Sequence, residues 1–508
     1  MLVGLLIIVP LIASLLVFLT KGKASRTAAL GLSIVEFVLA LVVYMQYKHN
    51  PDNSQLQLNY AWVESLGIHF AVSIDALSLL MVLLTTGLVP LIILSSFNTE
   101  YKNPNSFYGL ILLMQMALVG VFVANDGFLF YVFWELALIP IYFICLLWGG
   151  EGRARITFKF FVYTLFGSLF MLVGLIYLYN HTGFETGVKS WALTDLYAAG
   201  KSMTINQQSF VFWSIFLAFG IKMPIFPLHT WQPDTYVNAP TQGTMLLSGI
   251  MLKMGTFGLI KWLLPMAPLA LEKWGGVAIG LSVFGIIYAS LIAIAQKDFK
   301  RLIAYSSIAH VGLIAAGILA ANQQGIQGGV MQMLAHGINV VGLFLIADIL
   351  MRHTGTNDME KLGGIRSMNG NFAVLFLIVL LGSVALPLTN GFVGEFLLIT
   401  GVYQYNAWIA AFAGLTVILG AVYMLRGYQT IMLGEKKDSA IAFGSLASTD
   451  KWVLYIVCAA IVAFGVYPKP LNDLAEEGTK IIMMNLKISA NIAKIPSPLI
   501  INSPFILL

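Results

Sequence analysis

The sequence has 508 residues, of which 59% are hydrophobic and only 10% are charged, and its formal net charge is +5 at pH 7. This composition excludes a soluble globular domain and is typical of a chain that crosses a membrane many times. The lysines and arginines lie mainly between apolar runs, so the positive charge indicates membrane topology and not nucleic-acid binding. We expect no cofactor on this chain, because both cysteines lie inside apolar runs and the seven histidines lack metal-ligand spacing.

Apolar runs of about 18 to 25 residues predict fourteen membrane-spanning helices, and hence an all-α polytopic membrane protein. The predicted spans are residues 2–20, 28–46, 74–97, 107–124, 128–148, 158–180, 210–229, 240–262, 275–295, 301–319, 327–350, 372–404, 407–432 and 452–468. The first run has no positive n-region and no small-residue cleavage site, so we interpret it as a retained helix and not as a signal peptide.

The charged loops set the orientation, because cytoplasmic loops of membrane proteins are enriched in lysine and arginine. With the N-terminus on the outer side, most of these residues fall in the inner loops. The outer loops ahead of the C-terminal tail then carry only Lys48, Lys189, Lys201, Lys261 and Lys273. An even number of spans returns the C-terminus to the outer side as well.

Three segments outside the spans have predicted structure of their own. Residues 47–73 contain the alternating run QLQLNYAWV, which predicts a short β-hairpin, and residues 181–209 are polar enough to fold over the same outer end. Beyond Pro470, the run LNDLAEEGTKIIMMNLKISANIAK predicts an amphipathic helix that lies along the membrane interface.

Ionisable residues inside the spans carry most of the functional information, because a charge at the bilayer centre costs at least about 2.5 to 3.5 kcal/mol. The residues, all but the last within about 5 Å of a span midpoint, are Glu135, Lys222, Lys253, His310, His336 and Glu395. One such residue is equally well explained by a static ion pair, but six at similar depth favour a transport path. Glu36 lies in a peripheral span, and we interpret it as a contact to another helix or to another subunit.

The two histidines of this set leave alternatives open. A neutral imidazole hydrogen-bonded between helices explains His310 and His336 without any function. A proton relay is also compatible with them, because the ordinary pKa of histidine, about 6.5, lies close to working pH. The pair could also ligate a haem, although nothing else in the sequence indicates one.

Two of the charges lie beside predicted helix breaks. The motif KMPIFP places two prolines directly after Lys222, and proline removes a backbone donor and cannot continue a helix. In ALPLTNGFVGEF, a proline and two glycines precede Glu395. A broken helix survives in lipid only where protein or water satisfies the freed backbone groups, so both breaks predict water access. The charge on Lys222 would then respond to a carboxylate such as Glu135.

The polar positions also indicate a duplication, because those of the first half recur roughly 175 residues later. The pairs are Glu135 with His310, Lys222 with Glu395, and Lys253 with Arg426. Each unit holds five spans, and an odd number forces the second copy to insert upside down, as in many ion-coupled transporters with discontinuous helices. The predicted regions are N-terminal helices in 1–106, a first five-helix repeat in 107–262, a second, inverted repeat in 275–432, and a last helix with an amphipathic tail in 433–508.

At these residues the sequence resembles the antiporter-like membrane subunits of respiratory complex I, the proton-pumping NADH:quinone oxidoreductase. The matching motifs are VFWELALIPIY, FGIKMPIFPLHTWQPDTYVNAPTQGTMLLSGIMLKMGTFG, DFKRLIAYSSIAHVG, MLAHGINVVGLFLIADIL and NGFVGEF. The resemblance implies that Glu135 and Lys222 form an intramembrane ion pair. It further implies a hydrated axis continued by Lys253 and His310, ended by Glu395 toward the next subunit, with His336 as an additional member.

The resemblance implies a subunit that translocates protons without a redox centre of its own, driven by quinone chemistry elsewhere in the complex. Its partners would be other membrane-arm subunits on both flanks, lipids and protons. Its location would be a bacterial inner (plasma) membrane, with both termini on the periplasmic side. One motif departs from the family, because Gln232, Tyr236 and Asn238 replace an apolar residue, a histidine and a glutamate. The sequence therefore does not support an inner-side proton entry route through those groups.

Two other functions remain open from the sequence. A subunit of a multisubunit Na⁺/H⁺ antiporter would carry nearly the same charges, and co-purifying subunits would distinguish it. A purely structural membrane subunit would use the polar residues only for packing. Unchanged transport after neutralising Lys222 and Glu395 together would favour that structural role.

Overall fold

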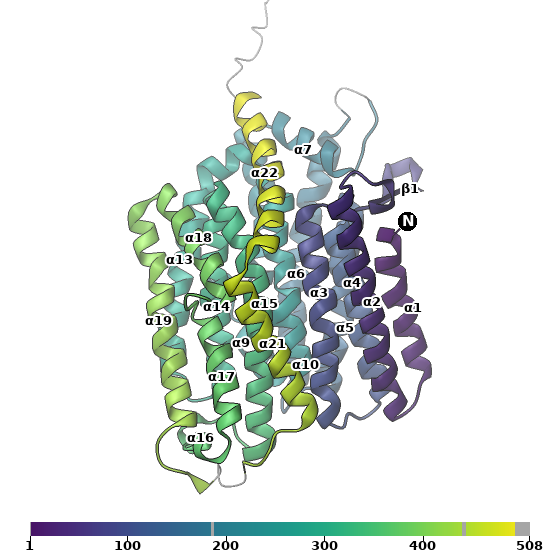
Figure 1. Cartoon of the computed structure of the whole chain (residues 1–508). Coiled ribbons are helices and arrows are strands. Elements are labelled where there is room, and N and C mark those ends of the chain that lie inside the picture. Colours follow the sequence, from purple (N-terminus) through teal and green to yellow (C-terminus); the bar gives the residue numbers. More distant parts are fainter. Residues whose placement is uncertain (1, 184–186, 439–442, 493–508) are drawn as a thin grey trace, which may run out of the picture.

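The protein is a bundle of roughly parallel helices with one small β-hairpin at one end (Figure 1). This computed structural model describes residues 2–183, 187–438 and 443–492. Among these residues, twelve helices are long and apolar enough to cross a membrane. The predicted helical membrane fold is therefore confirmed in its class.

The elements fall into four groups along the chain. The N-terminal group is α1 (Leu2–Leu19), α2 (Lys23–His49), β1 (Gln57–Val63), β2 (Ile68–Ser73) and α3 (Ala76–Ser95). The next group is α4 (Pro104–Val123), α5 (Gly127–Trp148), α6 (Arg153–His181), α7 (Leu193–Ser202), α8 (Ile205–Lys222) and α9 (Gln232–Asn238). It continues with a central helical segment made of α10 (Thr241–Leu246), the π-helical turn η4 (Leu247–Met251), α11 (Lys253–Gly258), the π-helical turn η5 (Leu259–Leu263) and α12 (Leu264–Met266).

The next part of the chain forms a further series of mostly long helices. It consists of α13 (Pro268–Ala295), α14 (Phe299–Leu319), α15 (Gln323–Thr354), α16 (Ile365–Met368), α17 (Gly370–Ser383), α18 (Asn390–Tyr405) and α19 (Ala407–Met432). The C-terminal group is α21 (Ser448–Val466) and α22 (Lys469–Ile492).

Two of the fourteen predicted spans, residues 210–229 and 372–404, are not continuous helices. In the first, α8 ends at Lys222 and an irregular segment leads to α9. In the second, α17 and α18 are separated by an irregular segment. Both interruptions coincide with the proline-containing motifs, because proline cannot continue the helical hydrogen-bond ladder. The count of fourteen crossings therefore stays a prediction.

The predicted β-hairpin is confirmed and marks one end of the bundle. β1 and β2 pair antiparallel, and the side chains of Asn59 and His69 hydrogen-bond across them at 2.8 Å. Helix α3 begins directly after the hairpin, where Asp75 caps it by accepting the Ser78 backbone N–H at 2.8 Å. We call this end of the bundle the hairpin end.

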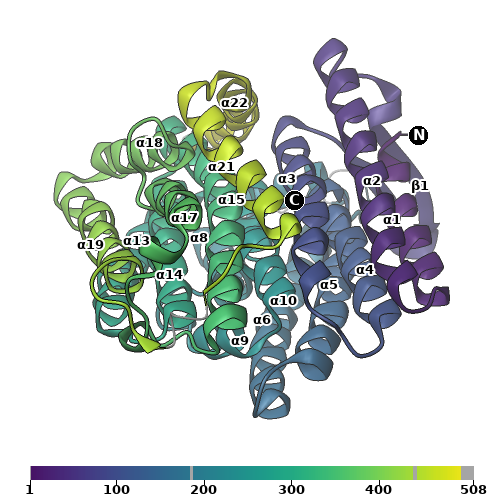
Figure 2. The ribbon, with the colours of Figure 1, turned by 60° about the horizontal axis from the view of Figure 1, so that its bottom comes forward.

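The best buried helices lie in the middle of the bundle. In the most apolar window of the central helical segment every residue is buried, and in α14 and α15 the share is 94%. The corresponding share is 28% in α2 and 33% in α19, which lie on opposite flanks in Figure 2. Polar side chains on the middle helices therefore contact protein instead of lipid, which lowers the cost of placing them at membrane depth.

Two sequence-based placements are wrong. Lys261, which the sequence analysis counts with the outer-loop lysines although it falls in the predicted span 240–262, lies within η5 and is 3% exposed. The helical segment extends to Met266, so Lys261 is not at its end. The C-terminal run forms α22 as predicted, but Figure 1 shows it rising along the bundle instead of lying across its end. Helix α22 contacts α3 and α15, and burial of Leu474, Ala475 and Ile482 favours this orientation.

Glu36 is enclosed by helices of this chain. It is 1% exposed in α2, which packs against α1, α3 and α4. Neither carboxylate oxygen has a hydrogen-bond partner within the described part of the chain. Of the two interpretations made from the sequence, this burial favours the contact to another helix over a contact to another subunit.

Candidate functional site: a buried row of ionisable side chains

The six ionisable residues predicted from the sequence all lie inside the bundle, on six different helices. Glu135 is half-buried in α5. The other five are at most 4% exposed. They are Lys222 at the end of α8, Lys253 at the start of α11, His310 in α14, His336 in α15 and Glu395 in α18.

Lys253 and His336 are in direct contact. The ammonium Nζ of Lys253 lies 2.8 Å from His336 Nδ1 and donates a hydrogen bond to the Ser248 carbonyl at 2.6 Å. That carbonyl belongs to the π-helical turn η4, in which the Leu252 N–H bonds five residues back to Leu247 instead of four. Such turns are rare and occur frequently at functional sites. Here the turn supplies a backbone acceptor for a buried lysine.

A close approach of two backbones makes the Lys253–His336 contact possible. A Cβ atom at Gly337 would lie 2.8 Å from the Gly249 carbonyl oxygen, closer than side chains normally come. Only glycine therefore allows α15 to pack this tightly against η4. The two glycines flank the residues that hold the ammonium, so they set the distance between Lys253 and His336.

His310 and Glu395 form the second direct contact of the row. His310 Nδ1 lies 3.0 Å from Glu395 Oε1, and the same oxygen accepts a hydrogen bond from Gln332 Nε2 at 3.1 Å. Helix α15 approaches α18 closely here, because a Cβ at Gly394 would lie 2.5 Å from the side-chain oxygen of Gln332. The carboxylate is thus held between a histidine and an amide.

The Lys253–His336 and His310–Glu395 contacts are neighbours, because their two histidine rings lie next to each other. The ring centroids of His310 and His336 are 6.1 Å apart. Buried polar atoms nearby have no hydrogen-bond partner within the described residues; they include His336 Nε2, Glu395 Oε2, Ser307 Oγ and Asn339 Oδ1. Buried polar atoms are normally satisfied by protein or water, so this part of the row has the polar lining that bound water requires. The His336 imidazole contacts Lys253, and the His310 imidazole contacts Glu395.

Glu135 and Lys222 are near each other but do not form the direct ion pair that the resemblance implied. The two charges interact electrostatically, yet no nitrogen–oxygen contact within 4.0 Å joins them in the described residues. Lys222 Nζ instead lies over the Trp134 ring, 5.4 Å from its centroid. Oxygen Oε1 of Glu135 has no hydrogen-bond partner there either.

Both helix breaks lie beside the row, as predicted, but on different sides of the charge. Lys222 is the last residue before the first break, whereas Glu395 comes after the second break, within α18. The Ile221 carbonyl freed by the first break accepts a hydrogen bond from Trp231 Nε1 at 2.9 Å. In the second break, Ala385 and Leu388 have φ values of 55° and 71°, a strained conformation for residues other than glycine.

One member of the predicted duplication does not join the row. Arg426 is exposed on α19, and its guanidinium donates to the Ile294 carbonyl at 3.5 Å. The residues that depart from the family motif lie at the start of the helical stretch after the first break. Gln232 and Tyr236 are fully buried, and Gln232 Nε2 donates to the Ala304 carbonyl at 3.4 Å.

Sequence reasoning missed three features of this region. The π-helical turns have no recognisable sequence signal, although the glycine in LLSGIML marks one of them. Gln332 donates to Glu395, but a neutral glutamine in a helix gives no sequence signal of that contact. Lys261 was assigned to a loop, although it lies in the same helical segment as Lys253 and pairs with Asp75 at 2.7 Å.

The chain is similar to known proteins over most of its length. A family described as NADH:quinone oxidoreductase/Mrp antiporter, TM, matches residues 124–420. NADH-quinone oxidoreductase subunit M of Rickettsia typhi is 37% identical over 482 residues, which cover 93% of this chain and 96% of the relative. NADH-ubiquinone oxidoreductase chain 4 of Arabidopsis thaliana is 34% identical over 473 residues, with coverages of 92% and 94%.

A solved structure is similar to this chain over nearly its whole length. A chain in respiratory complex I from Thermus thermophilus with bound NADH superposes with a TM-score of 0.85 at 31% identity, covering 95% of this chain and all of that chain. The chain therefore belongs to the antiporter-like membrane subunits of the NADH:quinone oxidoreductase/Mrp antiporter family. The curated relatives named above are subunit M and chain 4.

Proposed function

We propose that this chain is a proton-translocating membrane-arm subunit of an NADH:quinone oxidoreductase, with no redox chemistry of its own. The observation that carries this proposal is the pair of direct contacts Lys253–His336 and His310–Glu395, which bring titratable groups of four helices into one buried row. Family membership supports the same function, because the matched relatives are named as subunits of this enzyme.

The geometry supports a stepwise path for a proton. The Lys253 ammonium can give a proton to Nδ1 of neutral His336, which then releases its Nε2 proton toward His310 through water. His310 passes the proton to Glu395, with which it is in contact. Each step moves one proton and one charge between neighbours, so the next group along the row experiences a changed field. Glu395 ends the path toward a neighbouring subunit.

Glu135 and Lys222 act differently in this proposal. They do not contact each other, so a change of charge on one is felt by the other through the low-dielectric interior and not through a shared proton. Redox chemistry in other subunits would change the field at this end of the row. The changed field would shift the protonation of Lys222 and Glu135, and their new charges would change the field at Lys253.

The finer topology also belongs to the proposal. We infer fourteen crossings, with the interrupted segments α8–α9 and α17–α18 as the seventh and twelfth, and five-helix repeats of opposite orientation in 107–262 and 275–432. Similar pairs of helices pack in both halves, α4 with α5 and α13 with α14, and α6 with α8 and α15 with α18. The N-terminal region 1–106 and the C-terminal region 433–508 flank these repeats. The hairpin end and both termini are then periplasmic, in a bacterial inner membrane whose lipids and other membrane-arm subunits surround the chain.

The alternative of a Na⁺/H⁺ antiporter subunit has one specific support, because the family description covers Mrp antiporters as well. The two functions differ in their ion. NADH-driven proton uptake by the reconstituted complex that is unchanged when Na⁺ is replaced by choline supports the first function. A strict requirement for Na⁺ supports the second.

The central test uses the complete complex reconstituted in proteoliposomes. Lys222→Met and Glu135→Gln should each lower the number of protons translocated per NADH oxidised, because each removes one of the charges that switch the row. Lys48→Met, at an exposed position near the end of α2, is the matched control and should pump normally. Either row variant that assembles and still translocates protons at the wild-type ratio contradicts the proposal, and would favour a purely structural role for the polar row.

A further inference from the structure

A second buried ion pair lies between the central row and the hairpin end. Lys261 Nζ contacts Asp75 Oδ2 at 2.7 Å and Ser78 Oγ at 3.1 Å, and the Tyr197 hydroxyl donates to the Lys261 backbone carbonyl. The two side chains differ in exposure, which is 4% for Lys261 and 34% for Asp75. The pair therefore connects the protein interior to the surface.

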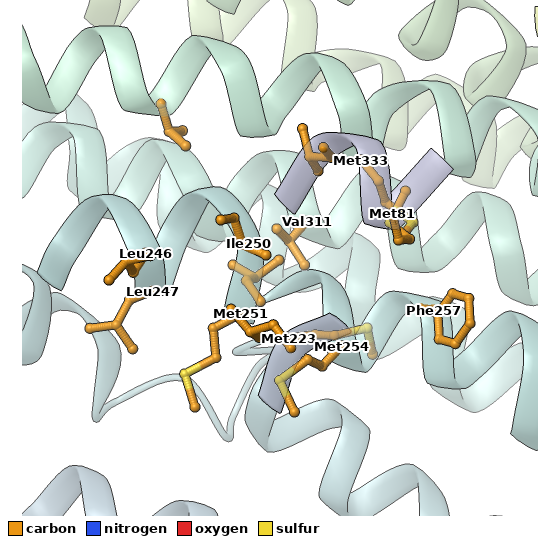
Figure 3. Close-up of a cluster of buried hydrophobic side chains, with 14 of the residues drawn as sticks. Met81, Met223, Leu246, Leu247, Ile250, Met251, Met254, Phe257, Val311 and Met333 are labelled. Atoms are coloured by element: carbon orange, nitrogen blue, oxygen red, sulfur yellow. The ribbon is translucent and has the colours of Figure 1, made fainter. Parts of the chain in front are cut away.

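Lys261 belongs to the same helical segment as Lys253. It lies eight residues further toward the hairpin end, or about 12 Å along the axis at 1.5 Å per residue. Along the segment between the two lysines, the only polar side chain is that of Thr256. Met254 and Phe257 lie on this stretch, and Figure 3 labels them in a buried hydrophobic cluster with Met81 of α3 and Met333 of α15. Each of the four is at most 1% exposed. We call these four residues the methionine plug.

We propose that the Asp75–Lys261 pair releases protons at the hairpin end, and that the methionine plug is the barrier separating it from the central row. This inference rests on the proposed function, because it needs a row that carries protons. A transporter needs such a barrier, since a continuous water chain from the midplane to the surface would let protons leak back. Apolar constrictions in channels close by excluding water, and flexible methionine side chains can repack when the barrier opens.

The proton balance of the release step is simple. The Lys261 ammonium transfers a proton to the Asp75 carboxylate, which gives a neutral amine and a neutral acid. Asp75 then gives this proton to bulk water and becomes a carboxylate again. The neutral Lys261 takes a proton from the row when the plug opens, which restores the ion pair. One proton has then moved from the row to the solution.

The properties of Asp75 fit a releasing group. Because 34% of its side chain is exposed, a protonated Asp75 can give its proton to bulk water. The capping of α3 uses Oδ1 of Asp75, so the contact of Oδ2 with a lysine is not needed to begin the helix.

A static ion pair is the competing explanation, and two variants distinguish it. Lys261→Arg keeps the charge pair, but arginine does not give up its proton in proteins. The double variant Asp75→Asn with Lys261→Met keeps a capping side chain and leaves no unpaired charge. Buried ion pairs replaced by neutral groups of similar size often leave stability unchanged, so the double variant should assemble, and Lys261→Arg should assemble because it keeps the pair.

The readout is proton translocation per NADH oxidised in the reconstituted complex, compared with Lys253→Met. We expect both release-site variants to lose the same fraction of translocation as Lys253→Met. Wild-type translocation by assembled Lys261→Arg overturns the release site, whatever the double variant does. If Lys253→Met itself translocates normally, the proposed function fails instead, so the two failures are distinguishable.

The plug has a separate test in the absence of NADH. Met81→Ser combined with Met333→Ser should raise passive proton permeability of the proteoliposomes several-fold, because hydroxyl groups allow water to enter the barrier. The matched control is Met171→Ser, a fully buried methionine of α6 away from the plug. Permeability that equals that of the control overturns the assignment of the barrier.

Discussion

The two ends of the buried row are built differently. At one end, Lys222 lies over the Trp134 ring and near Glu135 without touching its carboxylate. Further along, Lys253 contacts His336, and His310 contacts Glu395. The first end can therefore act on its neighbours only through its electric field, whereas the second stretch can pass protons from one atom to the next. We call the Glu135–Lys222 end the switch end, and the stretch with the direct contacts the path.

The largest effect should follow from breaking the path at its lysine. Lys253→Met removes the ammonium that holds both the Ser248 carbonyl and His336. Loss of a group that transfers protons lowers the step it serves by about 100-fold or more, so translocation through this chain should fall below detection while NADH oxidation continues. The measurement is proton uptake by proteoliposomes, with the exposed Lys273→Met as control.

A Lys253→Met complex with wild-type proton uptake would mean that the direct contacts do not form a path. Both parts of the row would then act on their neighbours only through their electric fields. If proton uptake and NADH oxidation fall together, Lys253 instead couples proton movement to the redox reaction.

The positions of the charges could be predicted from the sequence, and their contacts could not. A lysine or glutamate inside an apolar run is visible at once, because its cost in lipid demands an explanation. Prolines beside Lys222 and before Glu395 likewise mark the helix breaks, and the structure places interruptions there. Each of these inferences needs only neighbouring residues along the chain.

The contacts depend on packing between helices that are far apart in the sequence. Lys253 meets His336 because a π-helical turn and two facing glycines bring α15 close, and helical periodicity contains no signal for this turn. The contact of Lys261 with Asp75 likewise joins residues that lie 186 positions apart in the sequence. The ion pair expected at Glu135 and Lys222 came from the resemblance, and the bulky Trp134 ring is what the lysine faces instead.

An intermediate effect should follow from moving the two backbones apart. Gly337→Ala places a methyl group where a Cβ would lie 2.8 Å from the Gly249 carbonyl oxygen. Overpacking of this kind costs about 1 to 3 kcal/mol, and the resulting shift of α15 lengthens the Lys253–His336 contact. We expect slower proton uptake while the rate of NADH oxidation stays unchanged.

The matched control for this substitution is Gly280→Ala in α13, where an added Cβ meets no atom within 4 Å. It should behave as wild type. Equal uptake by the two alanine variants would show that the close approach of η4 and α15 does not set the proton path.

The smallest effect is expected at the switch end, where no hydrogen bond is broken. Trp134→Phe keeps an aromatic ring under Lys222 but weakens the attraction between the ring and the ammonium, which is strongest for tryptophan. A loss of less than about 1 kcal/mol corresponds to a reduction in uptake of at most about fivefold. Trp262→Phe is the control, because it is buried to the same degree and stacks on Phe130. A loss at Trp134 as large as that of Lys253→Met would mean that Lys222 is part of the path, because only a group that hands on protons would depend so strongly on its position.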